Sequence, residues 1–118
     1  MAVYAEISAM SGGVELGLVE VLLDESGEVA ARVITGTTPY GQGHRTTWAM
    51  LVADRLGVPF EKVTVVHGDT DLVPSSEITG GSRSVQLGGT NVWRASGVVA
   101  DKAREIAARL LEADVADV

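Results

Sequence analysis

The last third of the chain carries the most regular hydrophobic pattern in the sequence. Small or apolar residues recur there at alternating steps of four and three positions, at Val92, Ser96, Val99, Ala103, Ile106, Leu110 and Ala113. This spacing predicts one long amphipathic helix over residues 92–113, whose apolar face has to be buried against another element. The opposite face carries charges that are typical of a solvated surface and imply no partner, at Lys102, Arg104, Glu105, Arg109 and Glu112.

Three glycines lie in this helix or just before it. Each of Gly88, Gly89 and Gly97 costs about 1 kcal/mol relative to alanine in a helix interior. Two interpretations follow, and the sequence leaves both open. Either the helix starts late, or the glycines admit a close neighbour. The tail at 114–118 is expected to fray.

An antiparallel hairpin is predicted over residues 14–35. Its strands are 14–23, which alternates imperfectly between apolar and polar residues, and 29–35, which is rich in valine and isoleucine. The sequence DESG at 24–27 is typical of the turn between them. A further short strand is considered at 3–7, with a simple lead-in segment as the alternative.

A helix and a third strand follow the hairpin. Apolar residues recur at three-and-four spacing over 44–56, which predicts a helix, and Gly57 and Pro59 are the usual stop signals after it. A β-branched run predicts a strand over 61–66. The predicted order is β-β-α-β-α, an α+β two-layer unit with a mixed sheet and two helices on one face.

Length and composition are those of one soluble domain. The chain has 118 residues, 46% hydrophobic and 21% charged, so 1–118 is expected to form a single domain. The formal charge of −7 argues against a binder of bulk nucleic acid, which needs a concentrated basic surface. The absence of cysteine excludes disulfides, iron–sulfur ligation and a thiol nucleophile. No signal peptide or membrane span is found in the sequence, and a cytoplasmic location is expected.

Two glycine-rich loops stand directly before the two predicted helices. The first is YGQGH at 40–44 and the second is TGGSRS at 79–84. Free backbone N–H groups at a helix start bind anionic oxygens, and glycine lets a ligand approach the main chain. Together the loops can cradle a ligand with more than one phosphate, although each can also be a simple turn. The candidate binding residues are Gly41, Gln42, Gly43, His44, Gly81, Ser82, Arg83 and Ser84.

Several of these residues have a second interpretation. Ser82 and Ser84 also fit as helix N-caps. Arg83 fits either as an anion ligand or as an ordinary surface residue. Trp48 and Trp93 fall on predicted helices and are expected to be core anchors.

No complete catalytic constellation is found in the sequence. A dinucleotide-binding fingerprint fits badly because Thr46 stands at the third glycine position. A calcium loop beginning at Asp69 lacks the required glycine and terminal glutamate. The two histidines, His44 and His67, have no partner at a metal-binding helix spacing. A metal site held by protein side chains is therefore not expected.

Four segments together carry a resemblance to a known family. They are TGTTPYGQGHRTT at 35–47, ADRLGVP at 53–59, VTVVHGDTD at 63–71 and GSRS at 81–84. They closely resemble the molybdenum-binding large subunit of the aerobic carbon monoxide dehydrogenase-like enzymes, which belong to the xanthine dehydrogenase and aldehyde oxidase family. The match is collinear over 14–113, the expected core, and joins several separate motifs.

The resemblance implies an internal fragment of a larger cofactor-binding domain. The implied cofactor is molybdopterin, with the cytosine dinucleotide form expected and the plain form as the alternative. The segment 41–44 would contact its phosphate and pterin parts through backbone N–H groups and the Gln42 amide. Gly81, Ser82 and Ser84 would match the second cofactor loop, with Gly81 near the molybdenum. The pterin dithiolene holds the metal, so no protein ligand is implied.

The resemblance further implies an oxidoreductase that hydroxylates aldehydes or N-heterocycles, or oxidises carbon monoxide. Its partners would be the rest of the molybdenum subunit and the iron–sulfur and flavin subunits. The family's catalytic glutamate lies outside this region, and Glu77 is not in the matching position. The fragment alone is therefore expected to be inactive and to hold no stoichiometric cofactor. The sequence SSEI at 75–78 departs from the more glycine- and tyrosine-rich sequence that the resemblance associates with true carbon monoxide oxidisers. This departure argues against carbon monoxide as the substrate.

An interpretation of a different class stays open. In it, the chain is a stand-alone acidic α+β module that binds a partner protein or a small phosphate ligand. The reading frame around the chain separates the two, because several hundred further residues favour the cofactor lobe and a stop near Val118 favours the module. A lobe removed from its parent is also expected to expose apolar surface and to self-associate.

Overall fold

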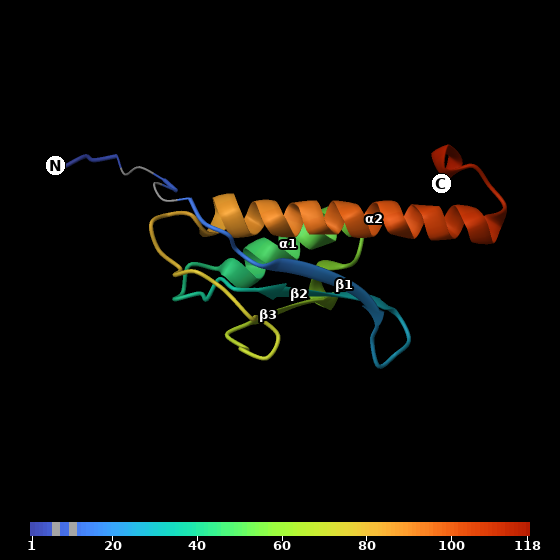
Figure 1. Cartoon of the computed structure of the whole chain (residues 1–118), viewed down its shortest axis with the longest axis horizontal. Coiled ribbons are helices and arrows are strands. Elements are labelled where there is room, and N and C mark those ends of the chain that lie inside the picture. The colour runs from blue at the N-terminus through green and yellow to red at the C-terminus, as the bar shows by residue number, and fades with distance from the viewer. Residues whose placement is uncertain (6–7, 10–11) are drawn as a thin grey trace.

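The computed structural model describes residues 1–5, 8–9 and 12–118. They form a three-stranded sheet with α1 and α2 on the same face of it (Figure 1). The strand order is β1-β2-β3, with β1 antiparallel and β3 parallel to β2. The main elements are β1 (Gly17–Leu23), β2 (Val29–Thr35), α1 (His44–Leu56), β3 (Val63–His67) and α2 (Thr90–Leu111). The predicted α+β unit with a mixed sheet and the order β-β-α-β-α is confirmed.

The hairpin of β1 and β2 is organised by its turn. Asp24 Oδ1 accepts hydrogen bonds from the backbone N–H groups of Ser26 and Glu28, at 2.9 and 3.0 Å. Gly27 adopts a φ of 80°, which glycine reaches without strain. These contacts fix the return of the chain, and β2 has the predicted bounds.

The first strand is shorter than predicted. It begins at Gly17 rather than at residue 14, because the preceding residues turn toward the start of α2. There the Asn91 side-chain amide donates a hydrogen bond to the Glu15 carbonyl at 2.7 Å. Gly17 allows this approach, since a Cβ there would lie 2.8 Å from the backbone of α2. The strand considered at 3–7 includes positions 6 and 7, which lie outside the described residues.

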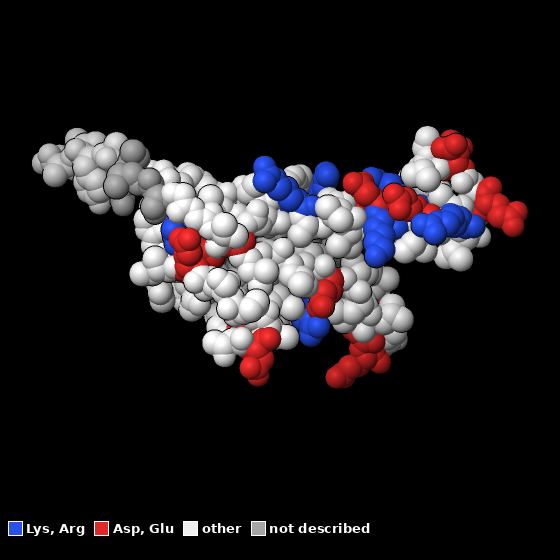
Figure 2. Space-filling model, viewed as in Figure 1, with Lys and Arg blue, Asp and Glu red and all other residues white. Residues whose placement is uncertain are grey.

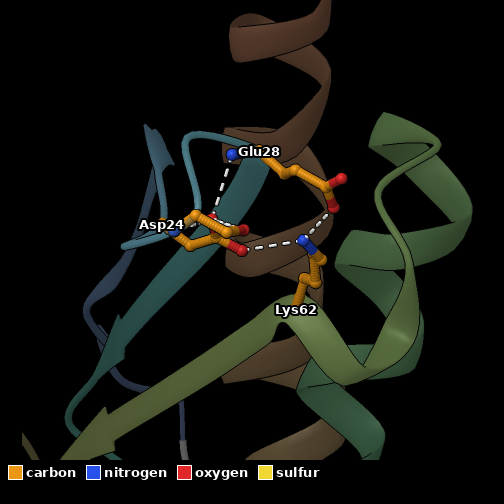
Figure 3. Close-up of polar contacts among 4 residues, drawn as sticks. Asp24, Glu28 and Lys62 are labelled. Carbon is orange, nitrogen blue, oxygen red and sulfur yellow. Dashed lines mark hydrogen bonds and ion pairs between the residues drawn. The ribbon is translucent and has the colours of Figure 1, made fainter.

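Lys62 joins the hairpin turn to the segment before β3 (Figure 3). Its Nζ donates to Asp24 Oδ2 at 2.7 Å and also to Glu28 Oε2. The hydrogen bond from Lys62 lowers the pKa of Asp24 well below its usual value, and hydrogen bonds within the turn act in the same direction. The predicted strand at 61–66 begins two residues later than expected, after a single 3-10 turn at Phe60–Lys62.

The hydrophobic core lies between the sheet and the two helices and is centred on Trp48. This side chain is fully buried, and its indole N–H donates to Thr37 Oγ1 at 3.1 Å. Thr37 in turn shares a hydrogen bond with Thr35, with 3.1 Å between the two hydroxyl oxygens. Trp48 is thus the core anchor that the sequence predicts. The other core residues are valines and alanines: Val19, Ala31, Val33, Ala49, Val52, Val58, Val65 and Val92.

The glycines before α2 let it pack closely on this tryptophan. Ser84–Gly89 forms a π-helical turn that runs directly into α2. A Cβ at Gly89 would lie 2.9 Å from the Trp48 ring, and one at Gly88 would lie 3.0 Å from Thr37 Cγ2. Such distances are too short for a close-packed interior. The close-neighbour interpretation is therefore confirmed, and the α-helix itself also starts late, at Thr90, after both glycines.

The third glycine makes room for a cation at the other end of the helix pair. A Cβ at Gly97 would lie 3.1 Å from Arg55 Nη2. The Arg55 guanidinium lies 4.9 Å from the centre of the Trp93 ring, a cation–π contact between α1 and α2. Trp93 is 37% exposed, so the prediction that it anchors the core is wrong.

The helix α2 is longer than the strand that it covers (Figure 1). Its 22 residues extend about 33 Å, whereas the seven residues of β1 extend about 24 Å. Because α2 begins over Gly17, its last turns project past the end of β1. Charged side chains gather over this projecting end, while the middle of the same face carries few (Figure 2). An apolar groove of about 540 Å³ between β1 and α2 is lined by Val21, Val99, Lys102, Ala103, Ile106, Ala107 and Leu110.

The chain after α2 folds instead of fraying. Glu112 ends the helix with a φ of 53°. The Asp114 carboxylate then accepts a hydrogen bond from the Ala116 N–H at 2.8 Å and caps the 3-10 turn Val115–Asp117. None of the helices in the described residues has the length and hydropathy of a membrane span.

Gly89→Ala should destabilise the domain, because the added methyl group meets the rigid Trp48 ring. We expect the free energy of unfolding to fall by about 1–3 kcal/mol, measured by urea denaturation. Gly12→Ala is the matched control, since a Cβ at Gly12 meets no described atom within 4 Å. Equal denaturation midpoints for the two variants would contradict the packing.

Acid should remove the contribution of the contact between Lys62 and Asp24. Because folding lowers the pKa of Asp24, its charged form stabilises the fold above the unfolded aspartate pKa of about 3.9. This contribution is lost as the pH falls from that value toward the folded pKa. Asp24→Asn should therefore lose less stability than wild type between about pH 7 and pH 2, measured by urea denaturation. Asp101→Asn, which removes an exposed pair with Arg104, should follow wild type.

The isolated chain should self-associate through the apolar groove, because exposed apolar surface of this kind favours association. Leu110→Lys, at a groove residue that is 79% exposed, should shift the population toward monomer in light scattering. Leu23→Lys is the control, because Leu23 is 67% exposed but does not line the groove. A monodisperse monomer of the wild-type chain would count against this expectation.

Candidate functional site

The first loop, residues 36–43, joins β2 to α1. Gly41 and Gly43 have φ values of 109° and 79°, and no described atom lies within 4 Å of the Cβ that either would carry. Glycine is therefore needed here for the backbone conformation and not for space. Gly43 is the N-cap of α1 and supplies no side-chain cap within the described chain. The first N–H groups of α1 are thus available to a ligand.

Gln42 folds back on its own loop. Its side-chain oxygen accepts a hydrogen bond from the backbone N–H of Tyr40. Because the oxygen is engaged in this way, the NH₂ group of the Gln42 amide is the part that can donate to a ligand. One turn further on, the Thr47 hydroxyl donates a hydrogen bond to the Gly43 carbonyl at 3.1 Å, across the first turn of α1.

The second loop, residues 79–84, has the backbone of an anion-binding nest. Gly81 and Ser82 have φ values of 65° and 51°, and Arg83 follows with φ −114° and ψ −13°. A left-handed residue followed by a right-handed one turns successive N–H groups toward one side, where they can bind an anion. The helical turn that starts at Ser84 has no side-chain cap in the described chain. The N-cap interpretation of Ser82 and Ser84 is therefore wrong.

The two loops meet at one cavity. The Thr38 N–H donates to Thr79 Oγ1 at 2.8 Å, which joins the loops directly. The cavity beside this bond has a volume of about 470 Å³, within the usual range for small-ligand sites. Its walls are formed by Tyr40, Gln42, His44, Thr79, Gly80, Ser82, Arg83, Ser84 and Val85.

Most of the residues predicted from the sequence are brought together here. The predicted residues that line the cavity are Gln42, His44, Ser82, Arg83 and Ser84. The predicted glycines, Gly41, Gly43 and Gly81, are not among the lining residues and shape the turns on either side. Sequence reasoning missed Tyr40, Thr79, Gly80 and Val85. The first three lie inside the two loop motifs and could have been included for that reason, whereas nothing in the sequence marks Val85.

His44 presents a buried neutral ring to the cavity. It is 4% exposed, and its ring centre lies 5.3 Å from that of Trp48. Burial lowers the pKa of His44, and the neighbouring His67 lowers it further, so the ring stays neutral near pH 7. Its Nδ1 atom is buried and has no hydrogen-bond partner among the described residues. A ligand in the cavity can satisfy such an atom.

The second histidine lies beside the first helical turn. Arg45 Nε donates to His67 Nε2 at 3.2 Å, which joins the start of α1 to the end of β3. Within the described part of the chain, no group of three or more His, Asp or Glu side chains could hold a metal ion.

Arg83 is buried, and carboxylates balance its charge. The side chain is 4% exposed, with Nη1 2.6 Å from Glu77 Oε2 and Nη2 3.7 Å from Glu15 Oε1. Nη2 also donates to the Ile78 carbonyl at 2.9 Å. The interpretation of Arg83 as an ordinary surface residue is therefore wrong. It reaches the cavity wall with its charge already opposed by two acids.

Comparison with protein families decides what kind of domain this is. The family model of the molybdopterin cofactor-binding domain matches residues 1–118. The chain belongs to this family.

Curated relatives of this molybdopterin cofactor-binding domain are much longer proteins. The carbon monoxide dehydrogenase large chain of Hydrogenophaga pseudoflava is 40% identical over 98 residues, which cover 83% of this chain and 12% of the relative. The nicotine 6-hydroxylase large subunit of Paenarthrobacter nicotinovorans is 36% identical over 98 residues, with the same shares of 83% and 12%. The domain therefore spans about an eighth of the length of these relatives.

Solved structures show the same fold as the molybdopterin cofactor-binding domain described here. The Cu,Mo-CO dehydrogenase matches with a TM-score of 0.73 and 36% identity, over 88% of this chain and 13% of that chain. Quinoline 2-oxidoreductase from Pseudomonas putida 86 matches with a TM-score of 0.69 and 34% identity, over 86% of this chain and 12% of that chain. The predicted resemblance to the molybdenum-binding large subunit is confirmed.

The cavity of the molybdopterin cofactor-binding domain fits a polar, anionic group. The first residues of the two helical segments, His44 and Ser84, line the cavity together with Gln42, whose NH₂ group can donate. Hydroxyl groups stand on the same walls, at Tyr40, Thr79, Ser82 and Ser84. The buried Nδ1 atom of His44 adds a polar position that has no partner among the described residues.

Proposed function

We propose that the domain binds molybdopterin in the cavity between its two loops, as part of the large subunit of a molybdenum hydroxylase. The observation that carries the proposal is the convergence of two N–H-rich helix starts on one cavity, joined by the bond from Thr38 to Thr79. The family of the domain supports the choice of cofactor. We expect the cytosine dinucleotide form, which is the form that the resemblance of the four motifs implies.

The residues of the two loops divide the binding between them. On the first loop, the N–H groups after Gly43 and the amide of Gln42 hold the phosphate and pterin parts. On the second loop, the nest at residues 82–84 holds a further anionic part, with Gly81 near the molybdenum. When bound, the cofactor supplies the metal centre at which oxygen is transferred to the substrate. The domain binds and orients it.

The parent enzyme is proposed to oxidise an aldehyde, an N-heterocycle or carbon monoxide and to pass electrons to iron–sulfur and flavin subunits. Two of the similar proteins are named for the N-heterocycles nicotine and quinoline. The SSEI sequence at 75–78 argues against carbon monoxide. The residues that select the substrate belong to other parts of the subunit.

The domain alone is proposed not to turn over. Glu77 is the acid beside the second loop, and its carboxylate pairs with Arg83 at 2.6 Å. This carboxylate is engaged by Arg83, and the resemblance to the family places the catalytic glutamate outside this region. The domain on its own is therefore a binding unit.

Gln42→Ala in the molybdenum subunit should lower its cofactor content. The lost amide contact leaves a polar group of the cofactor without a partner, which weakens binding by about 1–3 kcal/mol. The measurements are molybdenum per subunit by metal analysis and pterin content by fluorescence after oxidation. Gln86→Ala is the matched control, because Gln86 is exposed and does not line the cavity. Equal cofactor content in the two variants would remove the basis for this site.

A further inference from the structure

Arg83 of the second loop forms an ion pair with Glu15, an acid that is far away in the sequence. Besides its contacts with Glu77 and the Ile78 carbonyl, the Arg83 guanidinium lies 3.7 Å from Glu15 Oε1. The Glu15 side chain is 1% exposed. Glu15 belongs to neither loop. The alternation of apolar and polar residues around it in the sequence did not predict a contact with Arg83.

Glu15 is anchored to the core of the domain. Its carbonyl accepts a hydrogen bond from Asn91 in α2 at 2.7 Å. The next carbonyl, of Leu16, accepts one from the Gly36 N–H just after β2, at 3.4 Å. An arginine paired with Glu15 is therefore positioned relative to the sheet and α2. An arginine paired only with Glu77 is positioned relative to a neighbouring segment of the same loop region.

The buried state of Glu15 is unfavourable for stability alone. Its Oε2 atom is buried and has no hydrogen-bond partner among the described residues. Burial of a carboxylate with incomplete pairing costs free energy, and an apolar residue of similar size often stabilises a fold more. The charge of Glu15 is therefore better explained by its effect on Arg83 than by packing.

We propose that Glu15 is a positioning residue for the second loop: its carboxylate orients the Arg83 guanidinium, and Arg83 thereby holds the N–H groups of residues 82–84 toward the cavity. This role rests on the proposed function of the cavity. Arg83 is itself one of the residues that line the cavity, so a shift of this residue reaches the binding site.

Protonation of Glu15 should remove its charge pair with Arg83, so that Glu15 no longer orients the second loop. Burial raises the pKa of Glu15; the charge of Arg83 opposes this rise, and the carboxylate of Glu77 adds to it. Arg83 and Glu77 are the charged groups that face Glu15 among the described residues, while Asn91 and Gly36 are its uncharged neighbours. When Glu15 becomes neutral, Arg83 loses this charge pair; its contacts with the Ile78 carbonyl and with Glu77, which is 45% exposed and screened by water, do not tie it to the sheet and α2.

A pH titration of the 118-residue chain by NMR tests this role without any cofactor. The Glu15 carboxyl carbon should titrate above the ordinary glutamate value of about 4.3. The amide nitrogens of Ser82, Arg83 and Ser84 should shift with the same midpoint. A loop that does not respond, or that responds with a different midpoint, overturns the proposal. This comparison uses wild-type protein, so it holds even where a variant at Glu15 fails to fold.

Matched variants separate the charge of Glu15 from its shape. Glu15→Gln removes the charge at nearly the same size and should abolish the titration of the loop. Glu15→Asp keeps the charge and should restore it. Glu20→Gln is the control, because Glu20 pairs with Arg32 on the sheet at 2.6 Å and should leave the titration of the loop unchanged. A loop titration that persists in Glu15→Gln overturns the proposal.

Cofactor content in the molybdenum subunit distinguishes this proposal from the proposed function. Glu15→Gln should lower pterin content on the order of tenfold, the effect of losing one charged contact. Normal pterin content in Glu15→Gln, together with a loss in Gln42→Ala, overturns the positioning role and leaves the cofactor site standing. Normal pterin content in both variants overturns the cofactor site, and the positioning role falls with it.

Discussion

The packing of Trp48 against the glycines that precede α2 is the constraint on which the rest of the structure depends. The ring is fully buried, and its N–H bonds Thr37 at the base of the first loop. The same ring leaves no room for a side chain at Gly89. One tryptophan therefore fixes the first loop, the start of α1 and the π-helical turn after the second loop. The two loops converge because the helices that follow them share this contact.

In the proposed site, recognition of an anionic cofactor by an acidic domain does not depend on net charge. The chain carries a formal charge of −7. Among the residues that line the cavity, Arg83 is opposed by Glu15 and Glu77, and His44 is neutral. Attraction then comes from oriented N–H groups, whose partial charges act at short range. The acids around Arg83 organise the backbone that carries these groups.

Local signals predicted some elements with their observed bounds and missed others for a physical reason. The strand β2 and the helix α1 match the predictions, because a turn and a glycine stop signal act on the chain nearby. The strands β1 and β3 begin later than predicted, since contacts with distant residues act just before each strand. Asn91 bonds Glu15 before β1, and Asp24 bonds Lys62 before β3. The π-helical turn Ser84–Gly89 was not predicted. Its paired glycines disfavour a helix locally, and the contact with Trp48 compensates for them.

The sequence by itself determined the order of the elements, the place of both glycine-rich loops and, through four collinear motifs, the family. Periodicity, turn chemistry and motif spacing are local properties that a sequence displays directly. Only the tertiary structure decided that the loops share one cavity and that Arg83 faces Glu15. The bond from Thr38 to Thr79 spans 41 positions, and the bond from Asn91 to Glu15 spans 76. Contacts at such separations arise from how the helices pack on the sheet, which no local pattern encodes.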